Sequence, residues 1–273
     1  MMNMTSLSKF QNLIQTTSIF GLIFSFALSG CNDVELTSAW RNHEIIIDGS
    51  EKEWQDNMVY LSESKIALGI RNDEDFLYLC MVVGDRNTDR KIMGRGFTVW
   101  FDADGGKERT FGVHYPLGMQ GEQPQFRGQR DDGEPGQREQ FFQQMSSEME
   151  ILGPGKDDRL RMPLPGTNGI AIKMARAGDN LVYEIRVPFR KNSEQPYAIG
   201  TAAGKQISIG FETGDINMEM FRNRVSEEEM SSRDVAGPPR SDREGERTRS
   251  RQDNAPLKLW ATVQLTEKDY PKQ

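Results

Sequence analysis

Residues 66–83 read IALGIRNDEDFLYLCMVV and carry the clearest structural signal in the chain. Apolar Ile66, Leu68 and Ile70 alternate with small or polar residues, which is the period of a strand with one buried face. A polar run, Asn72 to Asp75, separates them from a second and almost wholly apolar run, Phe76 to Val83. Two such runs joined by a short polar turn predict a β-hairpin.

The same alternation recurs along the chain, in residues 97–101, 181–189, 207–211 and 259–265. No long segment has a convincing helical period. Many short strands separated by turn signals predict an all-β fold, an antiparallel β-sandwich. Because a strand needs a partner, the last run is expected to return to the main sheet.

Two stretches lack this alternation. Residues 121–166 are rich in Gln, Gly, Pro and charged residues, and residues 222–256 hold eight Arg against eight Asp and Glu. Such compositions bury too little apolar area to offset the entropy lost on ordering. We therefore expect two long low-complexity insertions, loops or disordered, within one sandwich domain at 40–265 that is followed by a tail at 266–273. The second insertion has an alternative interpretation as an arm that binds a protein partner.

The N-terminus has the pattern of a secretory signal peptide at 1–30. An apolar run, residues 19–28, follows Lys9 and ends in Leu28-Ser29-Gly30-Cys31. The run is too short for a transmembrane helix, which needs about 20 apolar residues. The last four residues resemble the lipobox of bacterial lipoproteins. That resemblance implies cleavage before Cys31, acyl chains such as palmitate on Cys31, and a short tether at 31–39.

The resemblance also implies a location. The protein is expected in the bacterial cell envelope, held to a membrane by its lipid. Asn32, in place of an aspartate, favours the outer membrane over retention in the inner one. If Cys31 is acylated, Cys80 has no disulfide partner, and its place in an apolar run predicts a buried thiol that behaves as a small hydrophobic residue.

Composition and motifs exclude several classes of function. The net charge is −7, and removal of Lys9 with the signal peptide leaves about −8. An acidic chain without a basic patch argues against nucleic-acid binding. The sequence contains no Gly-x-Ser-x-Gly motif, no Walker loop and no zincin motif. We therefore expect a protein that is not an enzyme.

Four motifs, taken in order, resemble those of family 9 carbohydrate-binding modules and their wider relatives. The first is Ile46-Ile47-Asp48-Gly49, followed after three residues by Glu53-Trp54, and the second is the hairpin at 70–78. The third is Phe97 to Phe101 with Asp102-Ala103-Asp104-Gly105, and the fourth is residues 181–188. The resemblance covers about 40–265 without the insertions. It implies a jelly-roll-like β-sandwich that binds carbohydrate without transforming it, and a packing role for Trp54. Relatives of this sandwich also bind haem or have no known ligand.

An aromatic face is the first candidate site. Pairing Trp100 with Thr110 in a hairpin places the apolar residues of both strands on one face, and Trp100 and His114 on the other. Trp260 likewise lies opposite its apolar strand neighbours. Exposed indoles suit the C–H face of a sugar ring, which predicts ligand binding by Trp100, His114 and Trp260. Alternatively, the two tryptophans cover the sheet beneath the insertions.

Asp102 and Asp104 form the second candidate, because two carboxylates in a turn can hold Ca²⁺. The spacing does not fit an EF-hand, and a simple hairpin turn is the alternative. Apart from this structural Ca²⁺ no cofactor is expected, since the chain has only His43 and His114 and no Cys/His cluster.

The sequence therefore predicts a membrane-anchored, non-catalytic binding lipoprotein whose ligand is a carbohydrate. An envelope scaffold or protein-interaction lipoprotein is the alternative. A haem-binding electron-transfer domain is a third, for which a histidine or methionine would have to ligate the iron.

Overall fold

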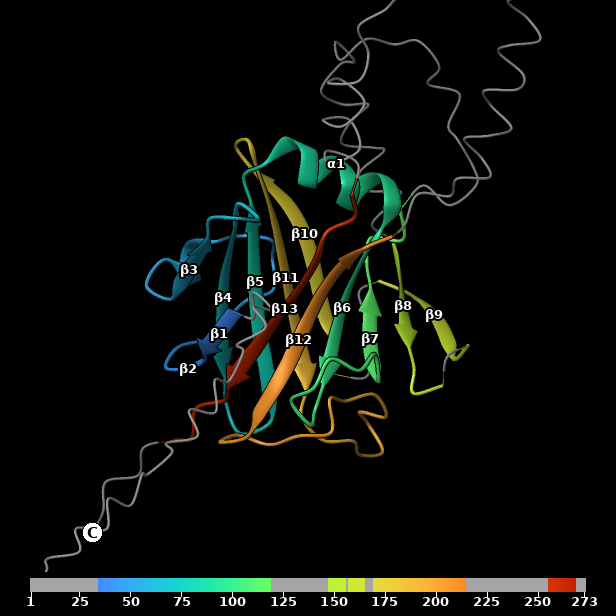
Figure 1. Ribbon diagram of the computed structural model, residues 1–273. Helices are drawn as coiled ribbons and strands as arrows, with labels where there is room; N and C mark the ends of the chain where they lie inside the picture. The colour runs from blue at the N-terminus through green and yellow to red at the C-terminus, as the bar shows by residue number, and fades with distance from the viewer. Residues whose placement is uncertain (1–33, 119–146, 156, 165–168, 215–254, 269–273) are drawn as a thin grey trace, which may run out of the picture. The chain divides into compact units, whose positions relative to one another are not determined.

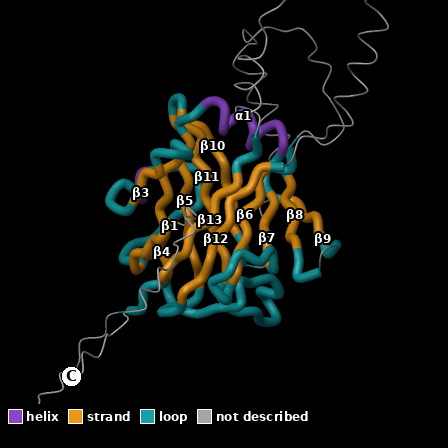
Figure 2. Tube along the Cα trace, viewed as in Figure 1, coloured by secondary structure: helices purple, strands orange, loops and turns teal. Residues whose placement is uncertain are grey.

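The computed structural model describes residues 34–118, 147–155, 157–164, 169–214 and 255–268. The expected signal peptide, Cys31 and most of the second insertion lie outside these ranges. In the described part, two β-sheets pack face to face, and strands dominate the trace (Figures 1 and 2). This confirms the all-β sandwich.

One sheet has seven strands, in the order β1-β13-β12-β6-β7-β8-β9. All neighbours are antiparallel except β1 and β13. β13 therefore returns to the main sheet, as expected. The bounds are β1 (Val34–Thr37), β6 (Phe97–Asp102), β7 (Phe111–His114), β8 (Glu148–Leu152), β9 (Arg159–Pro163), β12 (Gln206–Thr213) and β13 (Lys258–Gln264).

The other sheet has the order β10-β11-β5-β4-β2, with β3 also paired to β4. The predicted hairpin forms its centre as β4 and β5, with Ile66 opposite Val83. The bounds are β2 (Ala39–Trp40), β3 (Met58–Leu61), β4 (Ile66–Asn72), β5 (Phe76–Val83), β10 (Ala171–Ala177) and β11 (Asn180–Pro188). A 3-10 turn, η1 (Lys52–Trp54), precedes β3.

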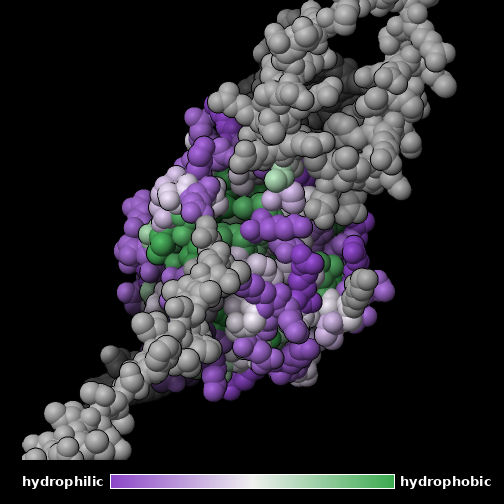
Figure 3. All heavy atoms as spheres, in the orientation of Figure 1, coloured by the Kyte–Doolittle hydropathy of each residue, from purple (hydrophilic) through white to green (hydrophobic). Residues whose placement is uncertain are grey.

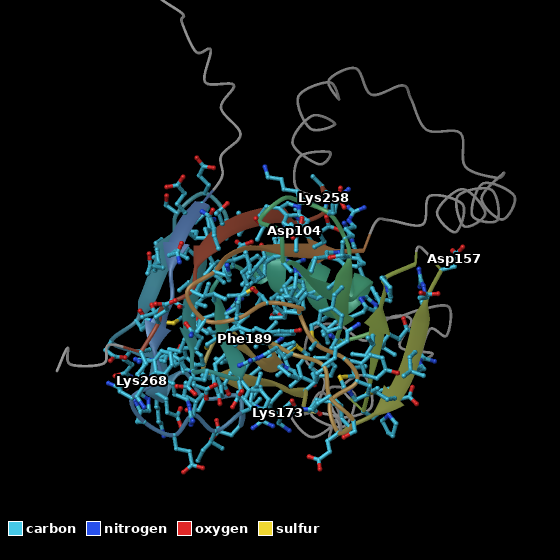
Figure 4. All side chains as sticks on the ribbon, turned by 90° about the horizontal axis from the view of Figure 1, so that it is seen from below. Asp104, Asp157, Lys173, Phe189, Lys258 and Lys268 are labelled. Carbon is cyan, nitrogen blue, oxygen red and sulfur yellow. The ribbon has the colours of Figure 1, made fainter. Side chains whose placement is uncertain are left out.

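The main core lies between the two sheets. Seen along the strands, Phe189 lies between the sheets, with Lys258 and Asp104 on one side and Lys173 on the other (Figure 4). Burying one Val, Leu, Ile or Phe side chain stabilises the fold by about 1.5–3 kcal/mol. Hydrophilic residues cover much of the face of β12 and β13 that is turned to the viewer (Figure 3). The inward-facing residues of the central strands include Leu77, Leu79, Val99, Phe101, Tyr183, Ile185, Ile209, Phe211, Ala261 and Val263.

Helix α1 (Arg86–Arg95) is a short helix that the sequence pattern did not predict. The side chain of Asp85 caps the helix by accepting a hydrogen bond from the backbone N–H of Thr88 at 3.0 Å. The helix ends at Gly96, whose φ is +80°. Ile92 is its one fully buried apolar side chain, so the segment has no apolar stripe that a helical period could reveal.

Two expected irregular segments contain strands. β8 and β9 lie inside the expected insertion at 121–166, and in the part of that range that the structure describes only Met149 and Ile151 are buried apolar residues. Such a short alternation is a weak signal. β1 lies inside the expected tether at 31–39 and pairs with β13, so the sandwich begins by Val34.

A second, smaller core covers the outer face of the six-stranded sheet. Trp54 is completely buried over Gly69, where a Cβ would lie 2.7 Å from the indole. Its Nε1–H donates to the fully buried carboxylate of Glu184 at 2.7 Å. The backbone N–H groups of Asp48 and Gly49 donate to the same carboxylate at 3.0 and 2.6 Å. Trp54 therefore packs within the fold, as its motif implied.

Gly49 makes this turn possible. Its φ of +87° is a conformation that residues with a side chain rarely adopt. The turn brings two backbone donors to Glu184, which sits in β11 far along the chain. Burial raises the pKa of Glu184, and the three N–H donors act in the opposite direction.

The Trp54–Glu184 hydrogen bond gives a test of this second core. Trp54→Phe keeps most of the apolar volume but leaves one buried carboxylate oxygen without its donor. We expect the free energy of unfolding to fall by about 1–3 kcal/mol, measured by urea denaturation with circular dichroism. Trp40→Phe, on half-buried β2, controls for the loss of an indole. Equal losses in the two variants would contradict the role given to Glu184.

Candidate functional site

Trp100 and Trp260 lie in one cross-strand row on the outer face of the seven-stranded sheet. Gly210 of β12 stands between them, opposite Trp100 on one side and Trp260 on the other. Gly112 of β7 is the next member, opposite Trp100. The row therefore alternates glycine and tryptophan, and we call these four residues the indole row.

The glycines provide a floor for the indoles. A Cβ on Gly112 would lie 2.6 Å from a ring carbon of Trp100, and one on Gly210 would lie 2.7 Å from a ring carbon of Trp260. Each indole therefore lies over the glycine of the neighbouring strand, and both lean in the same direction across the sheet. Both tryptophans remain half-buried. A larger residue at either glycine would displace the ring above it.

Charged groups surround Trp100. Its Nε1–H donates to Oε2 of Glu212 at 3.3 Å. Arg109 donates to the other oxygen of Glu212 at 2.7 Å, and its guanidinium carbon lies 6.0 Å from the centre of the Trp100 ring. The Arg109 side chain is about half exposed and that of Glu212 mostly buried. One edge of the indole row thus combines a flat apolar ring with a charged donor and a charged acceptor.

His114 does not join the indole row. It lies one register row away, opposite Thr98, and it is buried. Its Nδ1 and the Thr98 hydroxyl are hydrogen-bonded at 2.8 Å, and its ring packs against Gly96 at the end of α1. Burial lowers the pKa of His114, and the nearby charge of Glu150 partly opposes this.

The expected register of the hairpin was wrong by two residues. Trp100 lies opposite Gly112, whereas the sequence suggested Thr110. Thr110 instead lies beyond the ladder and donates its hydroxyl to the carbonyl of Phe101 at 3.1 Å. The side chains still face as expected, because moving the partner by two residues keeps every residue on its own face.

Asp102 shapes the turn that follows β6. Its buried carboxylate accepts the backbone N–H groups of Asp104 at 3.1 Å and Glu108 at 2.8 Å. Asp104 is exposed at the surface (Figure 4). These contacts are those of a hairpin turn. Within the described ranges, no group of three or more His, Cys, Asp or Glu side chains is placed to hold a metal ion.

The predicted state of Cys80 is confirmed. It is a free, buried cysteine in β5, and burial strongly raises the pKa of its thiol. Among the described residues, no helix has the length and apolar character needed to cross a membrane.

Four members of the site were not expected from the sequence: Arg109, Gly112, Gly210 and Glu212. The glycines did carry a signal. Each interrupts an apolar strand, between Phe111 and Val113 or between Ile209 and Phe211. A glycine inside a strand often marks a place where another group approaches closely.

Comparisons with known proteins give a distant likeness. No family model matches the chain, and no curated protein sequence matches it. The similar solved structures include two of a family 9 carbohydrate-binding module from Caldicellulosiruptor kristjanssonii, one in complex with glucose and one with cellotriose. They are 12% and 11% identical, with a TM-score of 0.31, and the match covers 66% of this chain and 77% or 75% of theirs. A likeness with this TM-score does not assign a function to the chain. The function has to be argued from the residues themselves.

The buried His114 predicts a pH dependence of stability. Its pKa is lowered from 6.5 in the folded chain, so below about pH 6.5 the unfolded chain binds more protons than the folded one. The free energy of unfolding should therefore fall as the pH drops below 6.5, towards the folded pKa. Urea denaturation of wild type and His114→Gln between neutral and acidic pH measures this, and the variant should show a shallower fall.

His43→Gln is the matched control, because His43 is exposed and is the only other histidine in the chain. It should keep the wild-type slope. If His114→Gln also keeps that slope, His114 does not resist protonation in the folded protein.

Proposed function

We propose that this protein is a non-catalytic module that binds carbohydrate on the indole row while held to a bacterial membrane by lipid on Cys31. The observation that carries the binding proposal is the pair of indoles lying over glycines in one row. A flat aromatic ring suits the C–H face of a pyranose, and charged or polar groups beside it can meet the hydroxyls.

Rigidity favours this use of the row. The rings rest on the backbone of neighbouring strands, so a ligand does not have to order them first. Preorganised side chains lose less conformational freedom on binding, which leaves more of the contact energy as affinity. Glu212 and Arg109 are similarly fixed by their mutual hydrogen bond at 2.7 Å.

A second function, an envelope scaffold, has one specific observation in its favour. The guanidinium of Arg109 lies over Trp100 and is already paired with Glu212. In that case the indoles serve to cover the sheet, and the protein binds a partner elsewhere. The expected arm for such a partner is 222–256, and its residues 222–254 lie outside the described residues.

Removing the indoles separates the two functions. Trp100→Ala and Trp260→Ala should each weaken binding to polysaccharide by about 2 kcal/mol, or roughly 30-fold, as for a buried aromatic anchor. Binding is measured on an array of plant, fungal and bacterial polysaccharides, including the producing cell's own envelope glycans. Circular dichroism checks that each variant is folded.

Two further variants sharpen this test. Gly210→Ala keeps both tryptophans but pushes the ring of Trp260 off its floor, so it should also weaken binding. Tyr60→Ala removes an exposed aromatic residue outside the row and should leave binding unchanged. Wild-type binding by both tryptophan variants, or no binding of any glycan by the wild type, would reject the indole row as a carbohydrate site.

The anchor is proposed from the sequence around Cys31, which lies outside the described residues. The sandwich begins at Val34, three residues later, so acyl chains on Cys31 would hold it within about 10 Å of the bilayer. Two or more chains hold a protein stably, since each buried methylene contributes about 0.8 kcal/mol. The outer membrane is the proposed location.

Cys31→Ser tests the anchor. It should abolish incorporation of radiolabelled palmitate and move the protein from the membrane fraction to the soluble fraction. Cys80→Ala removes the chain's other cysteine, which is buried, and should change neither result. Membrane fractionation that persists in Cys31→Ser would overturn the proposed lipid attachment.

A further inference from the structure

One edge of the sandwich collects the first three strands. β1 is the end strand of the seven-stranded sheet, and Ser38 alone separates it from β2, the end strand of the other sheet. β3 and β2 pair with successive parts of β4, β3 with residues 66–69 and β2 with residues 71–72. Figure 1 shows β1, β2 and β3 on one side of the molecule and β8 and β9 on the other. We call this side the β1–β3 edge.

Hydrogen bonds fix this edge to both sheets. The Ser38 hydroxyl bonds Asn72 of β4, and Thr266, just after β13, donates its backbone N–H to the same Asn72 side chain at 3.1 Å. The edge is therefore part of the rigid sandwich. A surface that binds this edge consequently fixes the orientation of both sheets.

Exposed apolar side chains lie on this edge. Tyr60 is 64% exposed and Val59 46% exposed, both on β3. β3 pairs with β4 and with no other strand of the described residues. The two remaining large apolar residues that are exposed in the described ranges lie elsewhere. Ile46 belongs to the segment that crosses the outer face of the six-stranded sheet, and Leu160 lies on β9 at the far edge.

The chain before β1 limits where the membrane can be. Val34 is the third residue after Cys31, and an extended chain spans at most about 3.6 Å per residue. A lipid on Cys31 would leave only about 10 Å between the bilayer surface and the start of β1. A link this short holds the edge that contains β1 close to the membrane.

We propose that the β1–β3 edge rests on the lipid surface of the anchoring membrane, with Val59 and Tyr60 in contact with the bilayer interface. The proposal rests on the proposed acylation of Cys31. Tyrosine suits this position, because its ring is apolar and its hydroxyl remains among the headgroups. We assign the partner of this edge as lipid, because the chain that leads into β1 starts at Cys31, the proposed site of acylation.

The cations next to β3 are each beside a carboxylate and do not form a basic patch for anionic headgroups. Asp56, which precedes β3, is paired with Arg71 at 2.5 Å, and Lys65, which follows it, is 3.6 Å from Asp85. The contact therefore depends on apolar side chains and not on attraction to anionic headgroups, so added salt should change it little.

In this orientation both sheets stand upright on the membrane surface, with their β1–β3 edge towards the lipid. The outer face of the seven-stranded sheet, which carries the indole row, would then rise from the membrane surface and remain open to a glycan. Neither of its tryptophans would have to leave a lipid contact before a ligand binds.

Site-specific fluorescence tests the orientation. The acylated full-length lipoprotein, produced with Tyr60→Cys and labelled there with a polarity-sensitive nitrobenzoxadiazole dye, is reconstituted in phosphatidylcholine–phosphatidylethanolamine vesicles. Leu160→Cys is the matched control, an exposed apolar residue on the opposite edge, and Cys80 is buried. We expect a blue shift and quenching by spin-labelled lipid at position 60 but not at 160.

The outcomes separate the orientation from the anchor. Vesicle flotation with solvent-like emission at both positions would overturn the edge contact while leaving the anchor intact. Failure of the wild-type protein to float would overturn the anchor and the contact with it. A third outcome would assign the edge to a second copy of the chain and overturn the membrane contact. In that case the label at position 60 of a soluble Cys31→Ser chain becomes buried as the protein concentration rises. The same label in the acylated protein is then not quenched by spin-labelled lipid.

Discussion

The packing of apolar side chains between the two sheets decides what the outer surfaces carry. In β6, Val99 and Phe101 must face inward, and Trp100 between them must then face outward. The same holds for Gly210 between Ile209 and Phe211, and for Trp260 beside Ala261. Because strands have a period of two, the core and the indole row are determined by the same register, and neither can shift without the other.

That register also explains why glycines stand where they do. An indole lies flat on a sheet only if the neighbouring strand offers no side chain at that position. Gly112 and Gly210 meet this condition, and a Cβ at either would overlap the ring. Glycine in a strand interior loses more conformational freedom on folding than other residues and contributes no packing of its own. The row therefore combines two weak positions of the sheet with two large aromatic side chains that shield them.

Sequence patterns predicted the parts of this fold that have regular periods. The hairpin β4–β5 and strands β6, β11, β12 and β13 follow apolar alternation, and so does the sidedness of Trp100 and Trp260. The register of β6 with β7 did not follow, because turn length is set by contacts of Asp102 with backbone N–H groups that no pattern displays. Helix α1 and strands β8 and β9 were missed because each buries too few apolar residues to produce a period. The burial of His114 was missed because its ring packs against Gly96, between α1 and β6, and no sequence pattern displays that contact.

Each sheet contains a tryptophan over a glycine with its Nε1–H donated to a glutamate, and the difference between the two arrangements bears on function. Trp54 lies over Gly69 and donates to Glu184 at 2.7 Å, and all three residues are buried. Trp100 lies over Gly112 and donates to Glu212 at 3.3 Å, while Glu212 is shared with the half-exposed Arg109. A ligand could reach the first arrangement only by displacing N–H donors that the buried carboxylate requires, so that arrangement is structural. The second already faces water, and a ligand that replaces that water meets rings and charges held in place. The same local chemistry thus serves the core on one sheet and is available for recognition on the other.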